Sequence, residues 1–130
     1  MRKLLVVALA VGMSAAWFGA ARAAGVPDDA KGFAGMIEGK VVAKGEKGVV
    51  VSVTKVLRTW RHNEAKRAES LVGKEVEVRV GPKARENVKK FVALLKVGDT
   101  ESFDVRNREG DGLEFLELTE VQRKRVEEAE

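Results

Sequence analysis

The sequence predicts a mainly β domain, a five-stranded Greek-key barrel with a helix between its third and fourth strands and a short C-terminal helix. Three observations predict it. Apolar and polar residues alternate through most of 33–118, which is the period of a half-buried strand. One internal segment changes to the helical period after the third alternating segment. Glycine-rich turns separate the first two and the last two alternating segments.

The first two strands are predicted to form a hairpin. Residues 36–44 (MIEGKVVAK) alternate between two faces, and residues 49–60 (VVVSVTKVLRTW) are rich in β-branched side chains, which favour strands. A glycine at each end of 45–48 suits a tight turn. Because 49–60 is long for a strand and its alternation breaks at 56–57, we expect it to bend or to carry a bulge.

A polar connection leads to the third strand and the helix. In 61–73 we expect a short helix that begins at Asn63 as its N-cap. Residues 74–80 alternate cleanly, with valines facing inward, and the next two residues, Gly-Pro, end the strand. Apolar side chains in 84–96 recur at i, i+3, i+4 and i+7, the stripe of an amphipathic helix. They are Val88, Phe91, Val92 and Leu95.

Two strands and a final helix complete the pattern. Residues 100–106 and 113–118 flank the turn sequence NREGDG. Thr119 is expected to cap a polar helix that runs to residue 130, with Gln122 completing a capping box. The apolar side chains that this helix can bury are Val121, Val126 and Ala129. With so few of them, we expect the helix to fray.

This order of elements resembles the OB-fold, a five-stranded Greek-key barrel whose helix closes one end. The resemblance covers roughly 33–118 and rests on the element order, the two glycine-rich turns, the helical stripe and the sequence KVGD at 96–99 before a strand. It implies a closed barrel without exposed strand edges, in a protein of small, exported, bacterial type. It also implies a binding face on the second and third strands and the loops beside them. Another small barrel or an α+β sandwich remains the alternative.

Residues 1–23 have the pattern of a cleavable signal peptide. Arg2 and Lys3 precede an apolar run over 4–18, and Ala-Arg-Ala at 21–23 provides a cleavage site before Ala24. As a helix the run would span roughly 22 Å, against about 30 Å of bilayer hydrocarbon, so a retained anchor is the less favoured alternative. We therefore expect a periplasmic or extracellular protein without stable membrane insertion after cleavage.

Loss of this leader changes the charge balance. The chain has 24 basic and 20 acidic residues and a net charge of +4, and without the leader's three basic residues the balance is 21 to 20. The nearly neutral charge of the remaining domain does not favour nucleic acid or an anionic membrane as its partner. The remaining chain divides into a flexible lead-in at 24–32, the barrel at 33–118 and the helix at 119–130. Because the chain has no cysteine, its stability must come from packing and hydrogen bonds.

No catalytic or metal-binding set can be assembled from these residues. The single histidine, His62, lies in a charged connection, and no serine has the context of a nucleophile. One histidine without thiolates cannot build the usual zinc sites, and 104–111 does not match a calcium loop. Glu75 and Glu77 are expected on a solvated strand face. We therefore expect no enzyme activity, no metal and no cofactor.

The candidate binding residues surround a tryptophan at the end of the second strand. A tryptophan flanked by arginines can stack on a flat ligand while the guanidinium groups hold an anion. The cluster consists of Arg58, Trp60, Arg61, Lys66 and Arg67. The competing interpretation, which the sequence favours, is that Trp60 packs the polar connection onto the barrel with Arg61 stacked over it.

These observations together predict an exported, non-enzymatic binding or interaction module. Its partner would be a protein, a glycan or an anionic ligand. One alternative is a single-stranded nucleic-acid binder, but such proteins use several stacking aromatics. Here Phe91, Phe103 and Phe115 belong to the predicted core, and nucleic acid is an unusual partner outside the cell. The other alternative is a structural component of an envelope assembly, which would expose an apolar patch or a strand edge.

The leader generates the first testable prediction. Because the small-residue site precedes Ala24, N-terminal sequencing of the protein expressed in a bacterial host should find Ala24 as the first residue. The intact chain starting at Met1 and recovered with the membrane fraction would instead establish the anchor.

Overall fold

The computed structural model describes residues 25–108 and 110–130. The signal peptide expected at 1–23 lies outside the described residues. Within the described part, none of the helices combines the length and the apolar character that a membrane crossing requires.

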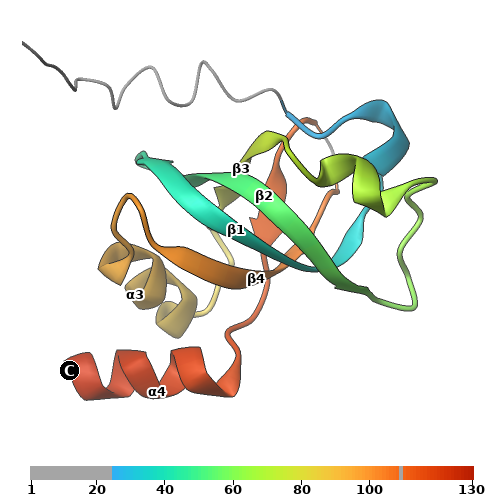
Figure 1. Ribbon diagram of the computed structural model, residues 1–130. Coiled ribbons are helices and arrows are strands. Elements are labelled where there is room, and N and C mark those ends of the chain that lie inside the picture. The colour runs from blue at the N-terminus through green and yellow to red at the C-terminus, as the bar shows by residue number, and fades with distance from the viewer. Residues whose placement is uncertain (1–24, 109) are drawn as a thin grey trace, which may run out of the picture.

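Five strands close into a barrel in the order β1-β2-β3-β5-β4 (Figure 1). They are β1 (Ala34–Lys44), β2 (Gly48–Thr59), β3 (Glu75–Arg79), β4 (Thr100–Arg106) and β5 (Leu113–Phe115). β3 pairs with β5 in parallel, and the other four pairings are antiparallel. The predicted fold class, a mainly β five-stranded barrel with a helix between strands 3 and 4, is confirmed and is consistent with an OB-fold-like protein.

The long second strand carries the irregularity that the sequence predicts. Met36 pairs with Arg58, whereas the next residue of β1, Ile37, pairs with Val56, so Leu57 has no partner on β1. A second shift leaves Thr54 without one. Each extra residue increases the local bend of the strand, which lets β2 wrap around the barrel.

The helix between β3 and β4, α3 (Glu86–Leu94), packs its apolar stripe against the end of the barrel (Figure 1). Phe91 meets Phe115 edge to face, with ring centroids 6.2 Å apart. Phe103 contacts the same ring at 5.3 Å. Phe33, for which the sequence suggested no place, is also fully buried. Four phenylalanines therefore share one core, as expected for the three in 91–115.

The C-terminal helix, α4 (Glu120–Ala129), begins with the predicted capping box of Thr119 and Gln122. The expectation that Val121 is buried is wrong, because its side chain is 68% exposed. Gln122 takes the inward position instead, and its Nε2 donates to the Ser102 carbonyl oxygen of β4 at 2.7 Å. Arg125 adds an ion pair with Glu101 at 2.6 Å. Polar contacts thus hold this helix against β4.

The polar connection differs from the prediction of a helix beginning at Asn63. The Asn63 Oδ1 accepts from the amides of Ala34 at 3.1 Å and Ala65 at 3.3 Å, so it caps a turn and ties the connection to β1. The 3₁₀ helix of this segment comes later, at Ala68–Leu71, where Leu71 is fully buried.

Residues 25–32, expected as part of a flexible lead-in, pack onto the barrel. Val26 and Ala30 are buried in the core, and Ala30 ends a 3₁₀ helix, Asp28–Ala30. The Val26 amide donates to the Asp111 carbonyl oxygen at 2.9 Å, and Lys31 forms an ion pair with the Asp111 carboxylate at 2.6 Å. Two small apolar side chains, a backbone hydrogen bond and an ion pair together hold this otherwise polar segment.

The turn between β1 and β2 generates the second prediction. A Cβ at Gly48 would overlap the Val78 carbonyl oxygen of β3, whereas a Cβ at Gly45 would meet open space. We expect Gly48→Ala to lower the free energy of unfolding by about 1–3 kcal/mol. The matched variant Gly45→Ala should leave it unchanged or slightly raised. Urea denaturation measures both, and equal effects at the two glycines would contradict the close approach of β2 to β3.

Candidate functional site

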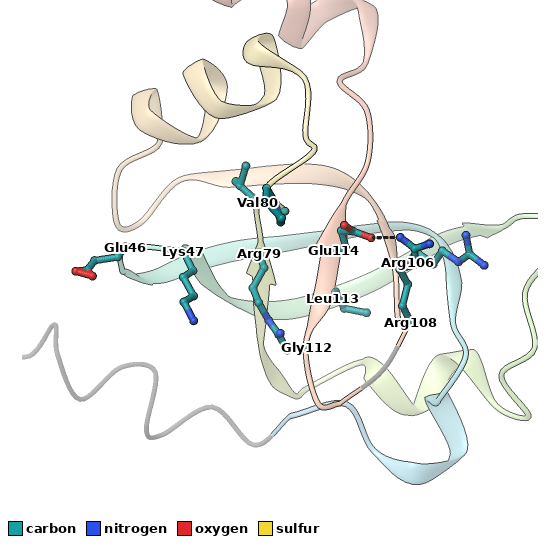
Figure 2. A pocket seen from close by; sticks show the side chains of 11 residues that line it. Glu46, Lys47, Arg79, Val80, Arg106, Arg108, Gly112, Leu113 and Glu114 are labelled. Atoms are coloured by element: carbon teal, nitrogen blue, oxygen red, sulfur yellow. Dashed lines mark hydrogen bonds and ion pairs between the residues drawn. The ribbon is translucent and has the colours of Figure 1, made fainter.

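A hollow of about 800 Å³ opens where the β1–β2 turn, the end of β3 and the β4–β5 turn meet (Figure 2). We call it the arginine cleft. Its charged lining residues are Lys47, Arg79, Arg106, Arg108, Glu46 and Glu114. Among the described lining residues, four cations stand against two carboxylates, a positive balance in a nearly neutral domain.

The barrel topology brings the arginines together. Glu114 of β5 pairs in register with Arg79 of β3 on one side and with Arg106 of β4 on the other. Arg108 follows in the turn, and its Nη1 lies 3.5 Å from Glu114 Oε1. Residues far apart in the sequence thus meet because three strands end at the same edge of the barrel.

The buried side chain of Asn107 orders the β4–β5 turn. Its Oδ1 accepts from the Gly32 amide at 2.8 Å. Its Nδ2 donates to the carbonyl oxygens of Gly112 at 2.9 Å and Gly110 at 3.2 Å. One amide group therefore ties both arms of the turn to the start of the barrel, which fixes one wall of the cleft.

Arg79 is the most constrained cation of the cleft. Its guanidinium lies directly over Gly112, where a Cβ would overlap it, and Figure 2 shows the side chain pointing to this glycine. Its Nε lies 3.1 Å from Glu77 Oε1, an ion-pair distance, but is buried without an aligned hydrogen bond among the described residues. Gly112 and Glu77 thus position the guanidinium at the wall of the cleft.

The lining of the cleft suits the binding of an anion. Arginines present planar donors that match carboxylate and phosphate groups. Val80 and Pro82 add apolar surface beside them. Among the residues that the structure describes, no histidine, serine or threonine lines this hollow. Across residues 25–108 and 110–130, no group of three or more histidine, aspartate and glutamate side chains is arranged to hold a metal.

The structure brings two of the five predicted binding residues together at the far end of β2. The Arg58 Cζ lies 5.7 Å from the ring centroid of Trp60, within cation–π range. Trp60 is half-buried, and its Nε1 donates to Asp104 Oδ1 of β4 at 2.8 Å. This contact gives the tryptophan a role in joining the end of β2 to β4.

Among the described residues, Arg58 is the cation that lies over the tryptophan ring, and the other three predicted residues form no such contact. Arg61 and Lys66 are exposed on the connection. Arg67 lies 3.7 Å from Glu69, and its backbone amide donates to the Asp29 carbonyl oxygen. None of the five lines the arginine cleft. Their part in ligand binding stays a prediction.

The arginine cleft was missed by sequence reasoning for a definable reason. Arg79 falls on the polar side of an alternating strand, and 107–112 has the composition of an ordinary turn. The available signal was the position of the arginines. Arg79 stands at the end of the third strand, Arg106 stands at the end of the fourth, and Arg108 follows it. The meaning of this signal depends on which strands are neighbours, and alternation does not reveal that.

Comparisons of the chain with protein-family models, with curated proteins and with solved structures found no match.

Asp104 generates the third prediction. Burial raises the pKa of its carboxyl group and Glu117 adds to the rise, while the Trp60 hydrogen bond and His62 act in the opposite direction. A raised pKa means that the folded protein binds this proton more tightly than the unfolded chain. Its contribution to stability is therefore complete below the ordinary aspartate pKa of about 3.9 and is lost as pH rises through the raised value.

We therefore expect Asp104→Asn to raise the thermal midpoint near neutral pH, because the amide oxygen still accepts from Trp60 without a charge. The gain should shrink in acid. Thermal unfolding followed across pH measures it, with Asp104→Ala as the control that removes the acceptor. A midpoint lowered near neutral pH by the asparagine variant would show that the charge stabilises the fold.

Proposed function

We propose that this protein is a non-enzymatic binding module that holds an anionic ligand in the arginine cleft. The observation that carries the proposal is the convergence of Arg79, Arg106 and Arg108 around one hollow. They come from two segments far apart in the sequence, so their meeting is a property of the fold. The export signal expected at 1–23 would place this binding outside the cytoplasm.

Preorganisation supports an anion as the ligand. The Arg79 guanidinium lies over Gly112 and beside Glu77, so the protein's own groups position it. A side chain that is already ordered loses little entropy on binding, so more of its interaction energy contributes to affinity. Arg106 and Lys47 form no ion pair with another described residue, so their charges can act on a ligand.

The geometry favours the arginine cleft over the tryptophan cluster as the site that binds the anion. A ligand stacked on Trp60 would have to share the ring with Arg58, and the indole nitrogen is already bonded to Asp104. The cleft, in contrast, offers an open volume with directed cations. Its described lining residues include no aromatic side chain, which makes a single-stranded nucleic acid the weaker candidate.

The fourth prediction tests this site with a small multivalent anion. Citrate should bind the protein at low ionic strength, and Arg106→Gln should weaken that binding by about tenfold, the effect of losing one charge-assisted contact. Isothermal titration calorimetry measures the affinity. Lys124→Gln, an exposed charge change on α4, is the matched control and should leave citrate binding unchanged.

A variant of the tryptophan cluster separates the two candidate sites. If Arg58→Gln weakens citrate binding and Arg106→Gln does not, the anion binds at the end of β2 and the cleft proposal is wrong. If citrate does not bind at low ionic strength, where charge attraction is strongest, the proposal fails altogether.

A further inference from the structure

The arginine cleft shares a wall with a second hollow of about 450 Å³. The shared residues are Glu46 and Lys47 at the β1–β2 turn and Val80 to Pro82 after β3. Beyond this wall the second hollow reaches α3, where Lys89, Val92 and Ala93 line it. The two hollows together therefore run from the β4–β5 turn, past the tip of the β1–β2 hairpin, to α3.

The cations of the second hollow differ in how far they are already engaged. Lys44 is occupied, since its Nζ donates to the carbonyl oxygens of Leu95 at 2.7 Å and Ala93 at 3.2 Å. Lys89 has only a long contact with Glu86, at 3.9 Å, and both side chains are exposed. Such a surface pair contributes little, so Lys89 can turn to a ligand at small cost. Lys47 lies between Lys89 and the arginines as part of the common wall.

We propose that the two hollows form one groove that binds an extended acidic segment of a partner protein. This inference rests on the proposed function and names its ligand class. Carboxylates of the segment pair with the arginines at one end and with Lys89 at the other. Apolar side chains between them pack on Val80 and Pro82, which a small anion would leave uncovered.

The pattern of the lining favours a peptide over a nucleic-acid strand. Among residues 25–108 and 110–130, no aromatic side chain lines either hollow, so bases would find no stacking platform there. Glu46 and Glu114 interrupt the row of cations, and an evenly charged phosphate backbone would meet both. A peptide can place an uncharged side chain at those points. Apolar lining surface likewise suits amino-acid side chains better than phosphates and sugars.

Ligand length provides the test. The probes are citrate, the peptide Glu-Glu-Leu and a threefold repeat of it, whose nine residues span about 30 Å when extended. We expect the long peptide to bind at least about tenfold more tightly than the short one. Lys89→Gln should lower the affinity for the long peptide by about fivefold and leave the affinity for citrate unchanged. Arg106→Gln should lower the affinity for all three probes.

A neighbouring lysine provides the control. Lys90 lies on the same helix but forms an ion pair with Glu130 and lines neither hollow. Lys90→Gln removes the same charge and should leave the affinity for the long peptide unchanged. Thermal midpoints of all variants, measured in parallel, establish that the compared proteins are folded.

The outcomes separate this inference from the proposed function. One outcome is that citrate binds through Arg106 while the long peptide binds no more tightly than the short one and its affinity is unchanged by Lys89→Gln. In that case the groove is wrong and the anion site stands. If neither citrate nor any peptide binds, both fail. If an oligothymidine of similar length binds more tightly than the peptide, with the same dependence on Lys89, the groove stands and the ligand class is wrong.

Discussion

The parallel pairing of β3 with β5 closes the barrel, and it consists of two residue pairs, Val78 with Leu113 and Arg79 with Glu114. The first pair is buried on the core side. The second lies at the opening of the arginine cleft. With no cysteine in the chain, packing around this short contact must hold the barrel closed. The fold and its candidate site therefore depend on the same few residues.

Arg79 lowers the stability of the fold at the point where the barrel closes. Its Nε is buried although the side chain as a whole is 41% exposed, and burying this nitrogen is unfavourable unless an ion pair with good geometry compensates it. The contact with Glu77 at 3.1 Å lacks the alignment of a hydrogen bond, so the compensation is incomplete. An apolar side chain would fill the space over Gly112 without that penalty. Local departures from optimal stability are typical of binding sites, and this one supports the proposed anion site.

Alternation and helical periodicity depend on residues close together in the sequence. They therefore predict strands, helices and their caps. The strand at Thr100–Arg106 and the capping box at Thr119 depend on neighbours in sequence, and both were found. Contacts between distant segments were not predictable in this way. Asn63 was expected to cap a helix but bonds the Ala34 amide instead, and the arginine cleft exists because β3, β4 and β5 end together. Topology had to be known before either could be found.

The tryptophan contact and the arginine cleft are built for different tasks. Met36 of β1 pairs with both Arg58 and Asp104, and the Trp60–Asp104 hydrogen bond spans the intervening strand β1. That bond braces β2 against β4 through side chains that are already engaged. Around the cleft, the β1–β2 and β4–β5 turns present cations whose positions the backbone fixes but whose charges are only partly compensated. A ligand gains more where the protein's own groups have not already satisfied one another, and for this reason the arginine cleft is the better binding site.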